Sequence, residues 1–365
     1  MKFVISKEEL NGLIGHIQNV VTQKATIPIL SNILIEASGS ELVITATDLT
    51  VGVRCRTEAK VFEEGATTLP AKKFAQLIRE ITAPHIEFSS TSDDVSKITA
   101  GSSHFNLHGI NKGEFPVLPD MSGAAQFKIK GEKLQDALFR TAFAVSREDH
   151  RPILTGVLMS IDNGTVAFIG TDGKRLAKIE QNIDIDESVS GQYVIPLKAV
   201  EEILKISGDD DAIVYVMEDK IAIDTNKSTI ITKLLSGSYP DVSRVIPEES
   251  DISVTLHREE LTSLLRQISL FTPDNNHSVR FVFSDGNLQL AINNAEIGTA
   301  KVNMPVNYDG EALQIAFNPA FFLDILRHSK DETVNIGLTD AFNPGVITDT
   351  SSALCVIMPM RLHEE

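Results

Sequence analysis

Two hydrophobic patterns recur along the chain. The segments 41–48 (ELVITATD) and 165–172 (TVAFIGTD) alternate apolar and polar residues, which predicts half-buried strands. An Asn-Gly pair directly before the second segment predicts a tight hairpin turn. Farther along, Phe74, Leu77 and Ile78 recur at helical spacing, which predicts an amphipathic helix that follows a strand end.

These patterns belong to a larger unit that occurs three times. PILSNILIEASGSELVITATDL (28–49) aligns with PILTGVLMSIDNGTVAFIGTDG (152–173) at an offset of 124, and 279–296 keeps the pattern more loosely. The strand-to-helix openings share one spacing, as in Phe3, Ile5, Glu8, Leu10; Phe127, Ile129, Glu132, Leu134; and Val254, Leu256, Glu259, Leu261. The sequence therefore predicts a triplication.

Each repeat is expected to run strand, helix, strands, helix, strands. That order predicts an α+β unit with two helices on one side of antiparallel sheet. Connectors that contain proline, at 113–116 and 237–240, separate the repeats. We place three similar domains at 1–124, 125–249 and 250–365.

Length and composition agree with a folded chain of several domains. The 365 residues exceed one ordinary core, and no apolar stretch is long enough to span a membrane or form a signal peptide. Only Cys55 and Cys355 occur. They fit buried thiols in a reducing cytoplasm better than a disulfide, so we expect a cytoplasmic protein.

The net charge of −17 argues at first against a nucleic-acid partner. The charge is unevenly distributed, however. Six windows that cover the expected helices together hold 16 Lys and Arg against 10 Asp and Glu, a net of +6, whereas the remainder is −23. The windows are 7–24, 71–80, 128–147, 198–206, 257–268 and 319–330. The count favours a basic helix layer. Lysines on helices also serve solubility, so the count alone does not establish a polyanionic ligand.

Triplication suggests a scaffold more than a catalyst. Similar domains joined head to tail close into rings or extend into filaments. No phosphate-binding loop, HExxH or GxSxG occurs, and the pair His104 and His108 lacks acidic or cysteine companions at ligand spacing. Asp48, Asp172 and Glu296 recur between repeats, which favours a turn role over acid/base chemistry. An enzyme and an acidic adaptor that binds peptides without DNA remain the alternatives.

Several ordered motifs identify a family. TIPILSN (26–32), GATTLPAKKF (65–74), GTDGKRLA (170–177), GSYPDVSRVIP (237–247) and VIMPMRL (356–362) resemble the bacterial DNA polymerase III beta subunit, the sliding clamp, over nearly the whole chain. The resemblance implies a clamp fold whose helices line a ring and whose antiparallel sheets lie outside. It also implies a non-catalytic processivity factor without cofactor or metal.

The resemblance further implies the partners. These are a second copy in a head-to-tail homodimer, encircled double-stranded DNA, the polymerase III alpha subunit, an ATP-driven clamp loader and other proteins with a clamp-binding motif; no membrane is involved. Peptide motifs would bind a pocket between the second and third domains. Its implied residues are Leu154, Thr171, Gly173, Lys174, Arg175, Leu176, Pro240, Arg244, Val245, Asn318, Phe321, Val356, Met358, Pro359, Met360 and Arg361.

Two positions depart from the family's usual pattern. Lys174 stands where His is common and Phe321 where Tyr is frequent, and the tail 363–365 extends past the usual end. A lysine adds charge and a phenylalanine lacks the hydroxyl, so peptide preference is expected to shift.

The resemblance also assigns DNA and subunit contacts. Phosphate contacts would come from Lys24, Lys72, Arg147, Arg151 and Lys198, without sequence information. The subunit contact would pair Phe105 and Leu107 with Leu270 and Phe271 of the second copy, covering an otherwise exposed strand edge.

Overall fold

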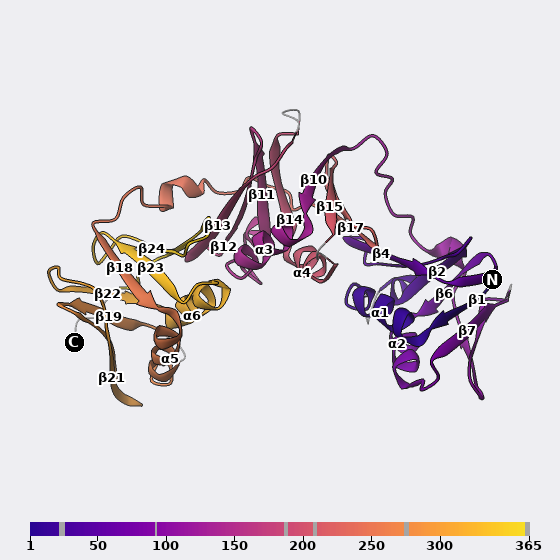
Figure 1. Ribbon diagram of the computed structural model, residues 1–365, viewed down its shortest axis with the longest axis horizontal. Helices are drawn as coiled ribbons and strands as arrows, with labels where there is room; N and C mark the ends of the chain where they lie inside the picture. The colour runs from indigo at the N-terminus through magenta and orange to yellow at the C-terminus, as the bar shows by residue number, and fades with distance from the viewer. Residues whose placement is uncertain (22–25, 92, 186–188, 207–209, 274–276, 362–365) are drawn as a thin grey trace. The chain divides into compact units, whose positions relative to one another are not determined.

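The contacts of the chain gather into two compact units. The computed structural model describes residues 1–365 except 22–25, 92, 186–188, 207–209, 274–276 and 362–365. Unit 1 comprises Met1–Gln135, Asp184–Val189 and Lys198–Leu234, and unit 2 comprises Asp136–Ile183, Ser190–Leu197 and Leu235–Glu365. The colour ramp in Figure 1 follows the chain through both. Helix α3 (Gly131–Ala142) begins in unit 1 and ends in unit 2.

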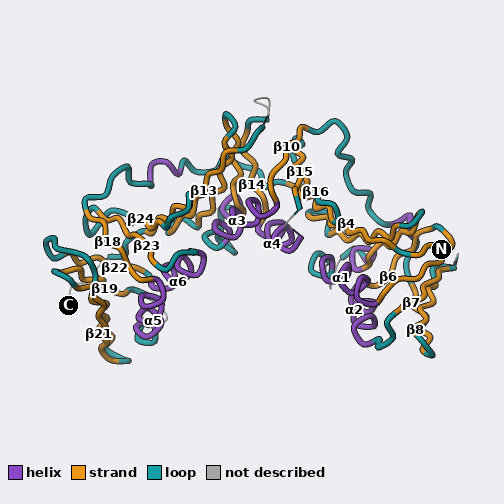
Figure 2. Tube along the Cα trace, viewed as in Figure 1, coloured by secondary structure: helices purple, strands orange, loops and turns teal. Residues whose placement is uncertain are grey.

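Unit 1 contains two antiparallel sheets with helices on one face (Figure 2). The helices are α1 (Lys7–Ile17), α2 (Ala71–Glu80) and, from its second residue, α4 (Leu197–Ile206). One sheet has the order β5-β1-β7-β8-β9 and the other β10-β15-β16-β17-β4-β3-β2-β6. The strands are β1 (Lys2–Ser6), β2 (Asn32–Ser38), β3 (Glu41–Thr47), β4 (Val51–Glu58), β5 (Lys60–Glu63), β6 (Gly65–Pro70), β7 (His85–Ser90), β8 (Val95–Ala100), β9 (Ser103–His108), β10 (Ala125–Lys130), β15 (Asp211–Val216), β16 (Lys220–Asp224) and β17 (Ser228–Lys233).

Unit 2 has the same layering, with α5 (Arg258–Ser269) and α6 (Pro319–His328) on its sheets. The sheet orders are β14-β11-β12-β13-β25-β24-β23-β18 and β21-β20-β19-β22. The strands are β11 (Gly156–Asp162), β12 (Thr165–Thr171), β13 (Arg175–Asn182), β14 (Gly191–Pro196), β18 (Ile252–His257), β19 (Val279–Ser284), β20 (Asn287–Asn294), β21 (Gly298–Pro305), β22 (Leu313–Phe317), β23 (Thr333–Leu338), β24 (Gly345–Thr348) and β25 (Ala353–Ile357). Short 3-10 helices are η1 (Pro28–Ser31), η2 (Lys112–Glu114), η3 (Pro152–Thr155) and η4 (Val242–Val245).

The hydrophobic patterns fold as expected. The two alternating segments form β3 and β12, and the amphipathic segment after Pro70 forms α2. The Asn-Gly pair joins β11 to β12 with positive φ at both residues, 47° at Asn163 and 77° at Gly164. That combination is the type I′ hairpin turn, which matches the twist of the strands it joins. The α+β fold with antiparallel sheets and helices is thus confirmed.

Both long sheets join strands of different repeats. In unit 1, β4 of the first repeat pairs with β17 of the second, with Gly52 opposite Ile231. In unit 2, β13 of the second repeat pairs with β25 of the third, with Leu176 opposite Val356. Strands β4, β13 and β21 are equivalent in the repeats, as are β9, β17 and β25. Consequently β9 and β21 each end a sheet in the described part of the chain.

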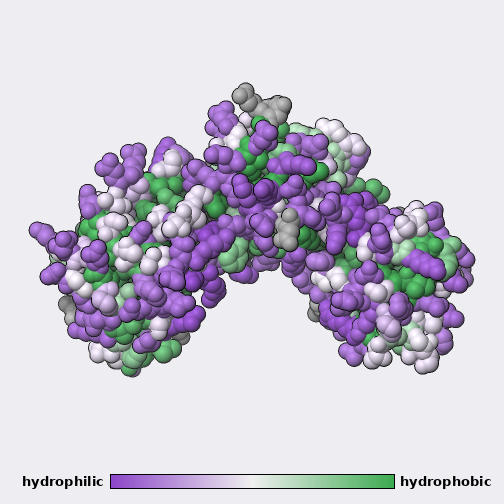
Figure 3. Space-filling view, in the orientation of Figure 1, coloured by the Kyte–Doolittle hydropathy of each residue, from purple (hydrophilic) through white to green (hydrophobic). Residues whose placement is uncertain are grey.

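Apolar side chains from sheets and helices form the cores. In unit 1 the rings of Phe3 and Phe88 stack at 4.8 Å between centroids. In unit 2 Phe281, Phe317 and Phe322 form a cluster with centroids 4.9 to 5.4 Å apart. Hydrophilic residues cover much of the face seen in Figure 3. No helix in the described residues has the length and apolar character needed to cross a membrane.

The contact units do not follow the three repeats. The strands of the second repeat divide between the two units, because half of them join the long sheet of unit 1 and half join that of unit 2. The boundaries near 124 and 249 therefore stay a prediction from sequence periodicity.

Candidate functional site

An open pocket lies in unit 2 where β13 meets β25. We call it the junction pocket; its volume is about 520 Å³, counted out to the open mouth. It is lined by Arg151, Leu154, Thr171, Gly173, Arg175, Leu176, Pro240, Asp241, Val242, Val245, Val356 and Met358.

The floor of the junction pocket is apolar and well packed. Leu154, Leu176 and Val356 are buried and belong to one hydrophobic cluster with Tyr239. The Tyr239 hydroxyl donates to the Ile169 carbonyl oxygen at 3.3 Å, and burial raises the pKa of this phenol far above its usual value. The floor is therefore continuous with the buried core.

More exposed apolar side chains form the mouth of the junction pocket. Val245 is 40% exposed and Met358 is 37% exposed, although both are large hydrophobic residues. A methionine side chain adapts its shape to different apolar partners. This combination of a buried, packed floor and an adaptable rim suits capture of short apolar segments.

The 171–175 turn sets one wall. Thr171 Oγ1 accepts from the Gly173 N–H at 3.0 Å, and Asp172 Oδ1 accepts from the N–H groups of Lys174 and Arg175 at 2.9 and 3.0 Å. Gly173 has φ of 82°, a conformation that favours glycine. Asp172 therefore has a turn role, as expected.

The same turn geometry recurs in the other repeats. Asp48 Oδ1 accepts from the N–H groups of Thr50 and Val51 at 2.8 and 2.7 Å. In the third repeat Glu296 also lies in the turn after a strand, but there the Asn294 side chain accepts, from the Glu296 and Ile297 N–H groups. An amide oxygen satisfies the same two donors as a carboxylate.

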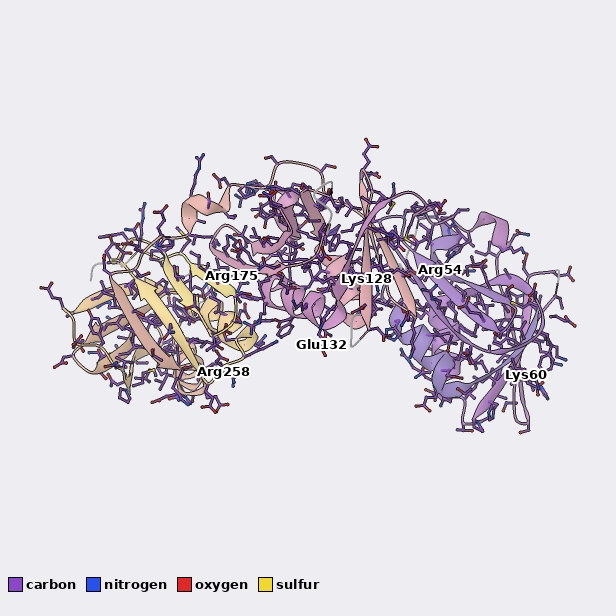
Figure 4. The ribbon with its side chains drawn as sticks, turned by 45° about the horizontal axis from the view of Figure 1, so that its top comes forward. Arg54, Lys60, Lys128, Glu132, Arg175 and Arg258 are labelled. Carbon is purple, nitrogen blue, oxygen red and sulfur yellow. The ribbon has the colours of Figure 1, made fainter. Side chains whose placement is uncertain are left out.

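Arg175 carries the charge of the wall but is fully engaged. Its guanidinium pairs with Asp172 at 3.2 Å and with Asp324 at 2.6 Å, and it donates to the Phe143 carbonyl oxygen at 2.9 Å. The Phe321 ring lies 4.6 Å from the guanidinium carbon, a cation–π distance. Arg175, labelled in Figure 4, thus ties the second repeat to α6 of the third.

The structure brings nine of the sixteen expected pocket residues into the lining. They are Leu154, Thr171, Gly173, Arg175, Leu176, Pro240, Val245, Val356 and Met358. The other seven are placed beside the cavity or away from it: Lys174, Arg244, Asn318, Phe321, Pro359, Met360 and Arg361.

Local structure explains why several of these seven do not line the cavity. The Asn318 side chain caps α6 by accepting from the Ala320 N–H at 2.9 Å. Phe321 lies against Arg175, and the Met360 N–H donates to the Ala316 carbonyl oxygen at 2.7 Å. Arg244 is 83% exposed and pairs with Asp241 at 2.9 Å.

Three lining residues were not among the expected pocket residues. Asp241 and Val242 follow Pro240 directly, so the connector itself was a signal for both. Arg151, which the resemblance assigned to DNA, lines the junction pocket and pairs with Asp149 at 3.2 Å. Its position before η3 carries no sequence signal for a pocket.

The remaining DNA candidates have separate environments. Lys24 lies outside the described residues. Lys72 is exposed in the first turn of α2, and Arg147 is exposed after α3. Lys198 Nζ lies 2.5 Å from Asp48 Oδ2 and 3.3 Å from the Val20 carbonyl oxygen. A phosphate would therefore have to compete with the Asp48 carboxylate.

The subunit-contact candidates lie on or near free sheet edges. Phe105 and Leu107 are half-buried on β9, which pairs only with β8 in the described residues. Leu270 follows α5 and is 77% exposed, and the Phe271 carbonyl oxygen accepts from Asn294 at 3.2 Å. Exposed apolar side chains beside an unpaired strand suit an interface.

Comparisons with known proteins cover the whole chain. The family descriptions that match are the DNA polymerase III beta subunit N-terminal domain over 1–119, central domain over 128–241 and C-terminal domain over 243–361. A beta sliding clamp of Chlamydia muridarum is 53% identical over 100% of both chains, and one of Pseudomonas aeruginosa is 29% identical over 99% of this chain and all of its own.

Solved structures give the same answer. The DNA polymerase III subunit beta of Pseudomonas aeruginosa is similar with a TM-score of 0.93 at 29% identity, covering 99% of this chain and 100% of that one. The sliding clamp of Bacillus subtilis has a TM-score of 0.93 at 26% identity, covering 100% of both.

Proposed function

The chain belongs to the DNA polymerase III beta subunit family and is a sliding clamp of DNA replication, and we propose that it works as a closed head-to-tail homodimer around duplex DNA. It acts in the cytoplasm as a non-catalytic processivity factor. Its proposed partners are DNA, the polymerase III alpha subunit, the clamp loader and other proteins with a clamp-binding motif.

One observation carries the ring proposal. Within the chain, a β4-type strand pairs with the β9-type strand of the following repeat, as in β4 with β17 and β13 with β25. In the described residues, neither β21 of the third repeat nor β9 of the first pairs with a strand of another repeat. A second copy supplies both missing partners, so two chains satisfy every such edge.

The DNA proposal rests on charge distribution. The six windows that cover the expected helices carry a net +6 against −23 elsewhere. The helices themselves hold 11 Lys and Arg against 10 Asp and Glu, a net of +1, so most of this positive charge lies on residues that flank them. Helices α5 and α6 border an open groove with Arg258, Arg266 and Arg327. Such a surface attracts phosphates without base readout, while the acidic remainder keeps direct affinity low. Retention then depends on closure of the ring.

The junction pocket is proposed to dock partner peptides. Its apolar floor, adaptable Met358 and exposed Val245 supply hydrophobic contact area, and the Asp241 and Arg151 groups supply a polar rim. Because Lys174 is exposed beside the pocket, acidic residues flanking a bound motif gain affinity from it.

The dimer is tested by sedimentation equilibrium of the pure protein. The wild-type chain of 39.9 kDa is expected to sediment as a dimer at micromolar concentration. Replacing both Leu270 and Phe271 with Asp is expected to give folded monomers, because unpaired charges in an interface are costly. The control is Phe342→Asp, because Phe342 is also an exposed apolar residue and lies on the 339–344 loop. A dimeric double variant would refute the interface assignment.

A further inference from the structure

Unit 1 holds a second open cavity, which we call the connector groove. Its volume is about 590 Å³, again counted to the mouth. It is lined by Arg54, Leu118, Pro119, Asp120, Met121, Thr229 and Ile231. Residues 118–121, which follow the first connector, supply one wall, and strands β4 and β17 supply the floor.

The connector groove has the same construction as the junction pocket. In both, the floor is a strand pair between consecutive repeats, Gly52 opposite Ile231 in one and Leu176 opposite Val356 in the other. In both, one wall includes residues that follow a proline at equivalent positions, 116 and 240. The triplication thus builds a similar concave site twice in one chain.

The two floors differ at one pair of equivalent positions. Where the junction pocket has Leu176, the connector groove has Gly52, and a Cβ at Gly52 would lie 2.5 Å from Leu118 Cδ2. Leu118 therefore packs directly on the backbone and fills the space of the missing side chain. The groove keeps an apolar surface of Leu118, Pro119, Met121 and Ile231 beside it.

The charge of the two sites differs. Arg175 in the junction pocket is neutralised by two carboxylates. Arg54 in the connector groove is exposed on β4 (Figure 4) and has no carboxylate within salt-bridge distance in the described part of the chain. The nearby Asp120 uses Oδ1 to accept from the Ser122 N–H and hydroxyl at 3.1 and 2.8 Å. The groove thus offers an unneutralised guanidinium beside apolar surface.

We propose that the connector groove is a second docking site, for a short partner segment in which a carboxylate side chain lies next to apolar side chains. The carboxylate pairs with Arg54, since a guanidinium binds carboxylates with two parallel hydrogen bonds. Its apolar neighbours contact Met121 and Ile231. Peptide binding at the junction pocket is not required for this proposal.

The test uses the full-length protein with labelled Met and Ile methyl groups. The probes are the capped peptides Ala-Leu-Glu-Leu-Ala and Ala-Leu-Gln-Leu-Ala. Met121 and Ile231 report on the connector groove, and Met358 reports on the junction pocket. The glutamate peptide is expected to shift Met121 and Ile231 and to bind about tenfold more tightly than the glutamine peptide.

Variants separate the two sites. Arg54→Gln is expected to remove the preference for glutamate, whereas Lys60→Gln, which removes an exposed cation of the same unit, is expected to keep it. Val245→Glu blocks the junction pocket and should leave the shifts of Met121 and Ile231 unchanged. The proposal would be overturned if only Met358 shifted or if no methyl group shifted. It would also be overturned if the glutamate and glutamine peptides bound equally tightly and Arg54→Gln changed neither affinity.

Discussion

Replacing Asp349 with Ala should destabilise unit 2 more than the loss of an ordinary ion pair. Asp349 Oδ2 lies 2.8 Å from Arg140 Nη1, and the two side chains are only 4% and 3% exposed. The pair joins α3, from the second repeat, to the turn between β24 and β25 of the third. It therefore stabilises the same repeat junction that forms the junction pocket.

The expected loss follows from the burial of Arg140. Removing one partner of a buried pair costs roughly 3–5 kcal/mol, because the other charge is left uncompensated. Arg140 keeps Asp136 at 3.1 Å, so we expect the lower end, about 3 kcal/mol. The Asp349 carboxylate also accepts from the Ser351 N–H at 3.0 Å, which adds to the loss.

Urea unfolding at pH 7, followed by circular dichroism, measures this free energy. The control is Glu180→Ala, which removes an exposed pair with Lys178 in the same unit and should cost less than about 1 kcal/mol. The double variant Arg140→Met with Asp349→Leu should recover most of the loss, since no buried charge remains. A loss below about 1 kcal/mol for Asp349→Ala would refute the reasoning.

The same carboxylate predicts a pH dependence. Burial alone raises the pKa of Asp349, but hydrogen bonds from Ser351 and Arg140 outweigh it, so the pKa is lower than usual. Its contribution is present above the unfolded pKa of about 3.9 and is lost as pH falls through the folded value. The difference in unfolding free energy between wild type and Asp349→Ala should therefore shrink in acid.

Three further predictions concern other elements. The centroid of the His328 ring lies 4.4 Å from those of the Phe139 and Phe143 rings. Burial lowers the pKa of His328, so the unfolding free energy should fall as pH drops below about 6.5. The variant His328→Phe should remove this pH dependence. Met358→Asp should weaken a clamp-binding peptide more than Met360→Asp in fluorescence anisotropy, because only Met358 lines the junction pocket; equal losses would contradict the geometry. Gly164→Ala should lower stability by about 1 kcal/mol in urea unfolding, since φ there is positive.

Much of the fold could be predicted because the same pattern of apolar and polar residues occurs in all three repeats. Alternation located β3 and β12, and apolar spacing located α2. The pairing of β4 with β17 could not be predicted, because alternation shows which face of a strand is buried and not which strand lies beside it. For the same reason, sequence gave no sign that the second repeat divides between two contact units.

The candidate site shows a similar division. GTDGKRLA and VIMPMRL were expected to share a pocket, and the pairing of Arg175 with Ile357 places these segments side by side. The roles of Asn318 and Phe321 depend on capping and stacking, which a motif match does not show. The Arg140–Asp349 pair spans 209 positions and has no local signature. Long-range polar pairs of this kind depend on the assembled sheets.

The central claim is that two chains close around duplex DNA, and retention on circular DNA tests it most directly. The protein is loaded onto a closed circle by its clamp loader, separated by gel filtration at moderate salt, and examined before and after a single restriction cut. A closed ring should remain on the circle and be lost after the cut, because the duplex then has ends. The account assigns retention to ring closure and not to direct affinity, so exchanging Lys72 and Lys198 for Glu should impair loading more than it shortens retention. Equal loss from circular and linear DNA would mean ordinary electrostatic binding and would contradict encirclement.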